Sequence, residues 1–77
     1  MKLEQLQQLV AEVIEADPAE ISSDTDLRAL PGFDSVNVLS LMITLDEQMG
    51  IRLSPAQAST LRYFRELEEI ARQQGKL

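Results

Sequence analysis

The side chains of this sequence that could do chemistry centre on the run Gly32-Phe33-Asp34-Ser35-Val36, which puts one hydroxyl at the start of a long apolar segment. If that segment is a helix, Ser35 lies in its first turn. There it is beside backbone N–H groups that lack a partner within the helix, at the positive end of the helix dipole. Both features favour a phosphate group at this position. The motif therefore favours a phosphorylated serine that serves as a covalent tether.

The composition excludes several other kinds of reactive site. The sequence has no histidine and no cysteine, so a Ser-His-Asp triad, a cysteine nucleophile and a histidine metal site cannot form within this chain. The carboxylate pairs Asp24 with Asp26 and Asp46 with Glu47 could bind a metal or move a proton. We interpret them instead as solvated charges, and we expect neither a metal site nor intrinsic catalysis.

Length and charge limit the partners. The chain has 77 residues, enough for one domain, which we expect to span residues 1–77. Its net charge of −6 disfavours binding to nucleic acid and favours basic protein partners. No stretch is long enough to span a membrane, and the amphipathic first residues do not resemble a secretory signal. The sequence therefore predicts a cytoplasmic protein.

The elements that must position Ser35 begin with a predicted helix and a long connection. Apolar residues recur at steps of three and four over residues 2–16, which predicts a helix that ends before Asp17-Pro18. No period persists over residues 21–33, where turn-forming residues indicate a connection. Loops of this length are more often functional than idle, and we expect this one to position the Asp34-Ser35 turn. The apolar residues expected to fix it to the core are Ile21, Leu27 and Leu30.

A second helix is predicted to begin at Ser35. Asp34 is expected to cap its N-terminus, and Gly50 to end it after Met49. Gly32 is expected to let the backbone turn so that Ser35 projects outward.

Two further segments complete the pattern. Residues 56–60 are predicted to form one or two helical turns, and residues 63–73 a helix that Gly75 ends. The helical period assigns Phe64, Leu67, Ile70 and Ala71 inward and Arg65, Glu66, Glu68, Glu69 and Arg72 outward. The sequence thus predicts an all-α fold, a small bundle of three main helices plus one short helix or turn.

The predicted helix after Ser35 has an unusually apolar surface. Residues 36–45 carry no charge, and more of them are apolar than one buried stripe of a helix can use. The core-facing row is assigned to Leu41, Leu45 and Met49, with Val38 or Met42. A second row, Val36, Leu39 and Ile43, is interpreted either as a strip on which a partner protein docks or as ordinary core and surface residues.

Together these segments resemble the acyl carrier protein family, whose small helical members hold acyl intermediates as thioesters on a phosphopantetheine arm. Thr25-Asp26-Leu27 resembles the family's loop anchor, and Gly32-Phe33-Asp34-Ser35-Val36 its Gly-x-Asp-Ser-Leu attachment motif. Residues 45–53 resemble its Leu-Glu-Glu-x-Phe-Gly-Ile-x-Ile pattern. The resemblance covers nearly the whole chain without an insertion.

The resemblance implies a function and its site. A phosphopantetheinyl transferase would move 4'-phosphopantetheine from coenzyme A to Ser35, and Asp34 would help to position that reaction. The loaded chain would then be a substrate of acyl-activating, acyltransferase or synthase enzymes in fatty-acid, polyketide or related specialised pathways, and not itself an enzyme. The implied protein is a discrete, monomeric acyl carrier.

The sequence departs from fatty-acid carriers in the placement of its acids. Asn37 and Ser40 stand where such carriers often have carboxylates, whereas acids gather around the first connection with a single base, Arg28. These acids either steer a basic transferase by long-range attraction or merely solvate the loop. They are Glu15, Asp17, Glu20, Asp24, Asp26 and Asp34.

Two other functions stay open. Aminoacyl or peptidyl carriers of nonribosomal-peptide pathways often have a double glycine before Asp-Ser, where this chain has Pro31-Gly32-Phe33. Alternatively, an unmodified helical interaction module could keep the carrier fold and use its apolar helix as a contact surface.

Overall fold

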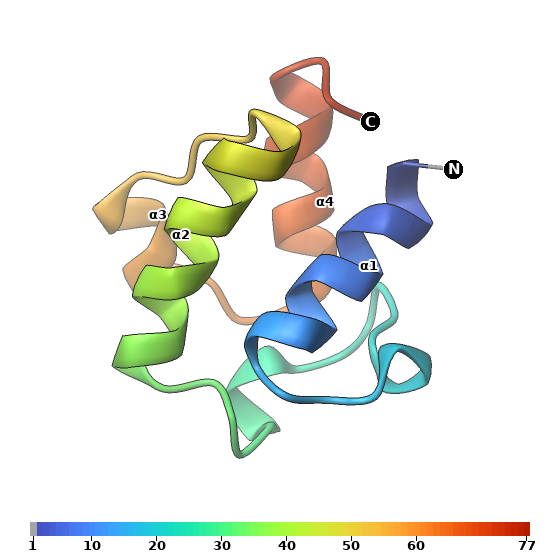
Figure 1. Cartoon of the computed structure of the whole chain (residues 1–77), viewed down its shortest axis with the longest axis vertical. Coiled ribbons are helices and arrows are strands. Elements are labelled where there is room, and N and C mark those ends of the chain that lie inside the picture. The colour runs from blue at the N-terminus through green and yellow to red at the C-terminus, as the bar shows by residue number, and fades with distance from the viewer. Residues whose placement is uncertain (1) are drawn as a thin grey trace.

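The computed structural model describes residues 2–77, which form helices and their connections (Figure 1). The main helices are α1 (Lys2–Val13), α2 (Ser35–Met49) and α4 (Phe64–Gln73), and the shorter α3 (Pro55–Thr60) lies beside α2. Two 3-10 turns, η1 (Pro18–Glu20) and η2 (Leu27–Ala29), interrupt the connection between α1 and α2. No helix in this described part has the length and apolar composition needed to cross a membrane. The predicted all-α bundle is confirmed.

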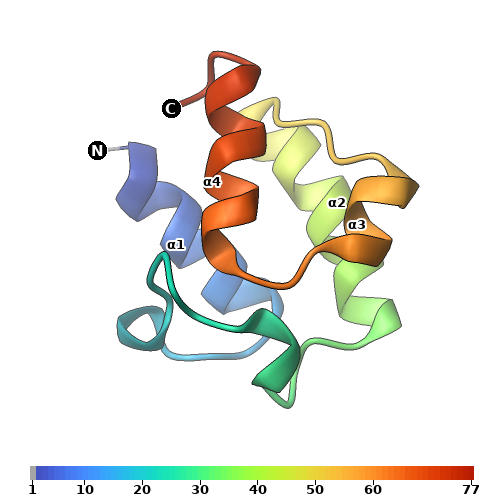
Figure 2. The same cartoon turned by 180° about the vertical axis from the view of Figure 1, so that it is seen from behind.

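The main helices enclose one apolar core, with α4 between α1 and α2 when the molecule is seen from behind (Figure 2). The largest side chains with less than 2% exposure are Leu6, Val10, Ile14, Ile21, Leu27, Leu41, Leu45, Ile51, Leu61, Phe64 and Leu67. Burying one such side chain contributes about 1.5–3 kcal/mol before conformational entropy is subtracted. Since the chain has no cysteine for a cross-link, this packing holds the fold together.

Helix α1 ends at Val13, so the predicted helix over residues 2–16 is too long. Glu15 adopts the left-handed conformation, with a φ of 58°. The N–H of Ala16 then donates to the carbonyl of Ala11 at 2.8 Å and closes the helix end. The apolar period misleads here because Ile14 stays buried after the chain has left the helix.

Helix α2 begins and ends where the sequence predicts. The Asp34 carboxylate accepts the N–H of Asn37 at 2.8 Å, which caps the N-terminus. Gly50 ends the helix in the left-handed conformation, with a φ of 66°. The predicted core row is confirmed for Leu41 and Leu45, which are fully buried, whereas Met49 is only partly buried.

The connection between α1 and α2 is held more firmly than its sequence suggests. The N–H of Leu27 donates to the carbonyl of Arg62 at 2.7 Å, and the N–H of Phe64 donates to the carbonyl of Thr25 at 3.0 Å. These bonds pair the connection with the segment before α4. Ile21 and Leu27 are buried as predicted, and Leu30 is partly buried.

The last two helices are confirmed, but one side chain assigned to the outer face of α4 is buried. Glu68, assigned to the outer face of α4, is only 7% exposed and accepts a hydrogen bond from the hydroxyl of Ser23 at 2.6 Å. The assignment is wrong because the connection covers this turn of α4. Ile70, assigned inward, is only partly buried.

Gly32 marks the point where the connection meets the end of α1. A Cβ atom added to Gly32 would lie 1.7 Å from the carbonyl oxygen of Ile14, far inside contact distance. Gly32 is not among the glycines with positive φ, which are Gly50 and Gly75. The expected turn is present, since the N–H of Phe33 donates to the carbonyl of Leu30 at 3.1 Å, but it does not require a left-handed residue. Glycine is required at position 32 by the close approach of two backbone segments.

Replacing this glycine should loosen the fold. Because the neighbour is backbone and cannot rotate away, we expect Gly32→Ala to lower the free energy of unfolding by about 1–3 kcal/mol. Denaturant titration of the variant measures the effect. Ser35→Ala, at an exposed position in the same region, is the control and should change stability by less than about 0.5 kcal/mol. Equal stabilities for the two variants would contradict the close-contact argument.

Glu66 satisfies backbone donors at the start of α4. Its carboxylate accepts the N–H of Tyr63 at 2.7 Å and the N–H of Arg62 at 2.8 Å. These two hydrogen bonds, that of Tyr63 first, lower the pKa of Glu66 against the opposing effect of burial. Stability from the charged form is therefore complete above the unfolded pKa of about 4.3 and is lost as the pH falls through the folded pKa.

Glu66→Gln tests this linkage, because glutamine keeps the accepting oxygen but not the charge. We expect the variant to be less stable than the wild type at pH 7, by about 0.3–1 kcal/mol, and equally stable at about pH 2–3. Denaturant midpoints across this pH range measure the difference. Glu47→Gln, on the exposed face of α2, controls for overall charge. A stability difference that does not shrink on acidification would rule out the proposed linkage.

Candidate functional site

Ser35 is an exposed residue at the first helical position of α2. The helix itself leaves its first N–H groups without partners, and Asp34 takes that of Asn37. The N–H groups of Ser35 and Val36 therefore have no partner within the helix. A phosphate ester on the Ser35 hydroxyl would lie beside these donors, at the positive end of the helix dipole.

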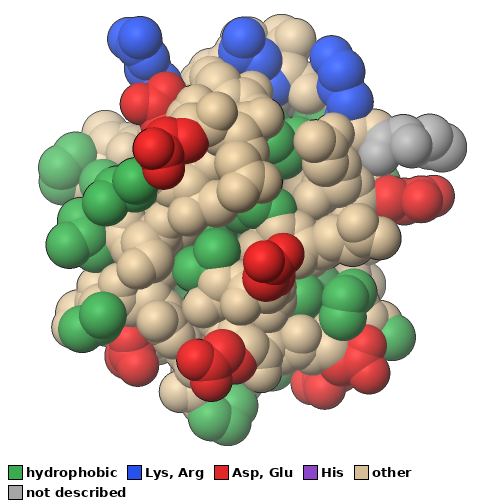
Figure 3. Space-filling view, viewed as in Figure 1, with side chains coloured by type: hydrophobic (Ala, Val, Ile, Leu, Met, Phe, Trp, Pro, Cys, Tyr) green, Lys and Arg blue, Asp and Glu red, His purple; other side chains and the backbone are tan. Residues whose placement is uncertain are grey.

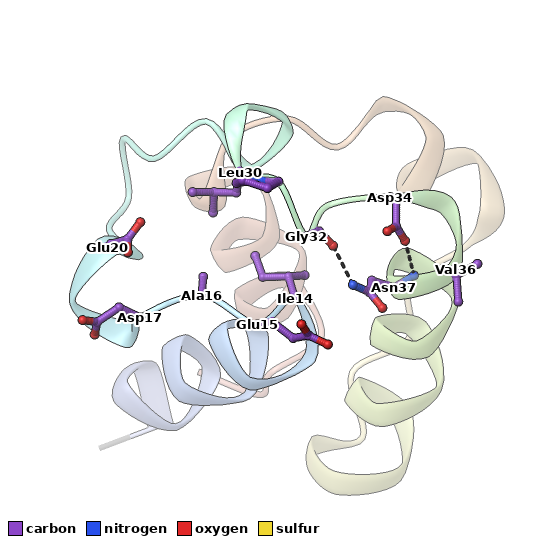
Figure 4. Close-up of a pocket in the computed structure, with 11 residues that line it drawn as sticks. Ile14, Glu15, Ala16, Asp17, Glu20, Leu30, Gly32, Asp34, Val36 and Asn37 are labelled. Carbon is purple, nitrogen blue, oxygen red and sulfur yellow. Dashed lines mark hydrogen bonds between the residues drawn. The ribbon is translucent and has the colours of Figure 1, made fainter.

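Asn37 ties the start of α2 back to the glycine turn. Its side-chain N–H donates to the carbonyl of Gly32 at 2.7 Å, while its backbone N–H binds Asp34 (Figure 4). From the sequence, Asn37 stands out only as a position where fatty-acid carriers often have a carboxylate. An amide three residues after a helix cap, where the side chain can reach the preceding turn, is the signal that could have revealed this contact.

A cleft of about 700 Å³ opens on the α1 side of this turn (Figure 4). Both polar and apolar side chains line it, and its charged residues are all acidic and all exposed. Those acids are Glu15, Asp17, Glu20 and Asp34. Ser35 itself lines a second cleft, of about 430 Å³, on the α3 side between α2 and α3.

The wall of the α3-side cleft includes a cation that sequence analysis left without a role. Arg28 donates to the carbonyls of Leu61 at 2.8 Å and Ser59 at 2.6 Å. Its guanidinium also lies 6.0 Å from the centre of the Phe33 ring. Arg28 thus fixes the end of α3 to the connection and sets one border of this cleft.

The predicted row Val36, Leu39 and Ile43 is exposed along α2. Its members are 71%, 58% and 52% exposed, and they are the large apolar side chains of residues 2–77 that solvent reaches most. We call this row the α2 strip. It begins directly beside Ser35, and the two clefts lie on either side of its start, with Val36 lining one and Leu39 the other.

The carboxylates of Asp24 and Asp26 form ion pairs with arginines. Within the described chain, no group of three or more His, Cys, Asp or Glu side chains is placed to hold a metal ion. Asp26 instead pairs with Arg62 at 3.2 Å, and Asp24 pairs with Arg65 at 3.3 Å.

The site fits a phosphopantetheine arm. It offers an exposed primary hydroxyl, free backbone donors for a phosphodiester and a cleft beside the attachment point that is lined mainly by apolar side chains. Asp34 and Asn37 would hold the turn that presents Ser35. The arm itself would supply the thiol on which an acyl group is carried, because the chain has no thiol of its own.

Comparison with known proteins agrees with this geometry. Residues 4–71 match the protein family described as a phosphopantetheine attachment site. Polyketide-8 synthase acyl carrier protein 2 of Streptomyces avermitilis is 34% identical over 58 residues, 75% of this chain and 67% of that protein. An acyl carrier protein of Treponema denticola is 31% identical over 71 residues, 92% of this chain and 91% of that protein. One from Treponema pallidum is 32% identical over 62 residues, 80% of each chain.

The family match covers most of the chain, and all three of these relatives exceed 30% identity over at least two thirds of their length. Members of this family are carriers rather than catalysts, and they work with phosphopantetheinyl transferases and acyl-handling enzymes. This chain belongs to the acyl carrier protein family, whose prosthetic group is covalently attached 4'-phosphopantetheine.

Proposed function

We propose that Ser35 is the residue that carries 4'-phosphopantetheine, and that the arm holds acyl intermediates of fatty-acid, polyketide or related specialised synthesis in the cytoplasm. The observation that carries this proposal is the exposed Ser35 hydroxyl at the capped N-terminus of α2. The names of the relatives, one of them a polyketide synthase carrier, favour acyl over aminoacyl or peptidyl cargo.

The attachment reaction places clear demands on this chain. The Ser35 oxygen attacks the pantetheine-bearing phosphorus of coenzyme A, a new phosphodiester forms, and adenosine 3',5'-bisphosphate leaves. The hydroxyl proton must go to a base, and this chain has no histidine to accept it. Asp34 is engaged with the N–H of Asn37, so its role is to position the turn. The partner transferase supplies the base.

We also propose that the α2 strip is where partner enzymes dock. Its three side chains are exposed, begin next to Ser35 and follow one face of a helix, which suits insertion into an apolar groove of a partner. Charge is absent from residues 36–45, so this contact would not require desolvation of ionised groups on α2.

Mass measurement tests the attachment site. After incubation with coenzyme A, Mg²⁺ and a phosphopantetheinyl transferase of broad carrier specificity, the wild type should gain one phosphopantetheinyl group and Ser35→Ala none. Ser40→Ala, also exposed on α2, is the control and should load like the wild type. Loading of folded Ser35→Ala would overturn the assignment of Ser35. A folded wild type that gains nothing would favour an unmodified interaction module.

Charge placed on the strip tests docking. We expect Leu39→Asp and Ile43→Asp each to slow malonyl transfer onto the loaded chain by about tenfold or more, since a buried carboxylate would replace an apolar contact. Ser40→Asp adds the same charge beside the strip and should change the rate far less. The rates are measured with a fatty-acid or polyketide malonyltransferase. Unchanged rates in both strip variants would remove the strip as a docking surface.

A further inference from the structure

Asn37 makes two hydrogen bonds that enclose the attachment serine. Its backbone N–H donates to the carboxylate of Asp34 at 2.8 Å, and its side-chain amide donates to the carbonyl of Gly32 at 2.7 Å. Figure 4 shows both bonds, which run from Asn37 to the turn before α2. Residues 33–36 therefore form a short loop that is closed at Asn37, and Ser35 lies within this loop.

The acceptor of the side-chain bond is held in place independently of α2. The backbone of Gly32 lies against the carbonyl of Ile14, so close that an added Cβ atom would be 1.7 Å from that oxygen. The N–H of Phe33 also donates to the carbonyl of Leu30 at 3.1 Å and closes the turn. Through the amide of Asn37, the start of α2 is thus fixed to the end of α1.

Helix stability does not explain an asparagine at this position. Asparagine is among the weaker helix formers, and a carboxylate in the first turn would interact more favourably with the positive end of the helix dipole. An amide, unlike an ionised carboxylate, can donate to a carbonyl. The partly buried bond from Asn37 to Gly32 is the contact that requires this donor.

The direction of the Ser35 hydroxyl depends on the closed loop. Ser35 is exposed, so little packing restrains its side chain. The position of its oxygen therefore follows the backbone of residues 33–36, which the two hydrogen bonds of Asn37 hold.

We propose that Asn37 is a positioning residue for the attachment of phosphopantetheine. This inference rests on the proposed attachment at Ser35 and names a residue that acts on the same reaction without touching the reacting atoms. By holding the Gly32 turn, the Asn37 side chain aligns the Ser35 oxygen with the phosphorus of coenzyme A in the transferase complex. Attack at phosphorus is sensitive to alignment, and a displacement of about 1 Å can cost about a hundredfold in rate.

The charge near Ser35 separates this role from simple attraction of a partner. In the view of Figure 3, Lys and Arg side chains gather at the upper end, whereas the lower half of this face shows acidic charge alone. Helix α2 begins in that lower half (Figure 1). A carboxylate at residue 37 would add to this negative charge, and it would speed loading by a transferase with a cationic surface if attraction limited the rate. The positioning role predicts the opposite change.

Asn37→Asp tests the inference, because aspartate has the shape of asparagine but cannot donate to the Gly32 carbonyl when it is ionised. We expect kcat for loading to fall about tenfold and KM for the carrier to change less than about twofold, since the docking surface is intact. Asn37→Ala removes the same bond without adding charge, and its kcat should fall similarly. Ser40→Asp adds the same charge one turn further along α2, outside the loop, and is the control that should keep the wild-type kcat. Denaturant titration confirms that all three variants are folded.

A second set of measurements separates positioning from general damage to the fold. Once it has been fully loaded by long incubation, Asn37→Ala should accept a malonyl group from a malonyltransferase at the wild-type rate, because that enzyme acts at the end of the flexible arm. In ¹⁵N relaxation of the unloaded chain, the order parameters of residues 33–36 should fall in Asn37→Ala from the rigid value of about 0.85, while those of residues 40–48 stay unchanged.

Two results would overturn the inference while attachment at Ser35 stands. One is loading of Asn37→Asp with a kcat at or above that of the wild type. The other is an equal loss of loading and of malonyl transfer in Asn37→Ala, which would indicate a structural role only. Absence of loading in the folded wild type would instead overturn the proposed function.

Discussion

The contact between Gly32 and the carbonyl of Ile14 fixes where Ser35 lies. At this point the connection passes so close to the end of α1 that the separation leaves no room for a side chain at residue 32. The carbonyl of Gly32 also accepts the side chain of Asn37, which ties α2 to the same turn. The end of α1, the turn and the start of α2 therefore form one unit. The position of Ser35 therefore depends on residue 32 having no side chain.

The other end of the connection is held by α3 and α4. Backbone bonds join it to the segment before α4, and Arg28 binds the carbonyls of Ser59 and Leu61 at the end of α3. Glu68, buried against Ser23, adds a hydrogen bond between side chains. The serine thus projects from a connection secured at both ends. Such support restricts the orientation of the Ser35 hydroxyl, whereas a free loop would allow it many orientations.

Local sequence pattern predicted the helices, and most of the wrong predictions arise from contacts between segments distant in sequence. The helical period, the Asp34 cap and Gly50 predicted both ends of α2 correctly, because the ends of this helix are determined by neighbouring residues. The burial of Glu68 and the need for Gly32 depend on contacts distant in sequence, which the sequence period does not encode. The end of α1 is local, but the apolar period continues through the buried Ile14 and conceals it. For the candidate site, Ser35, Asp34 and the exposed strip could be predicted, but the clefts and Arg28 could not, because each is assembled from several elements.

The separation of charged side chains from the apolar strip suits a carrier protein, which must dissociate from each partner enzyme after the reaction. Charges at the border of a contact act over distance, so they raise the rate of encounter more than they slow dissociation. A small apolar contact along α2 would hold a complex in register without the cost of desolvating carboxylates. If the acids lay within the strip, association and dissociation would depend on the same side chains. In this protein the acids lie on the α1 side and the strip consists of Val36, Leu39 and Ile43, so charge and apolar surface are divided between different side chains.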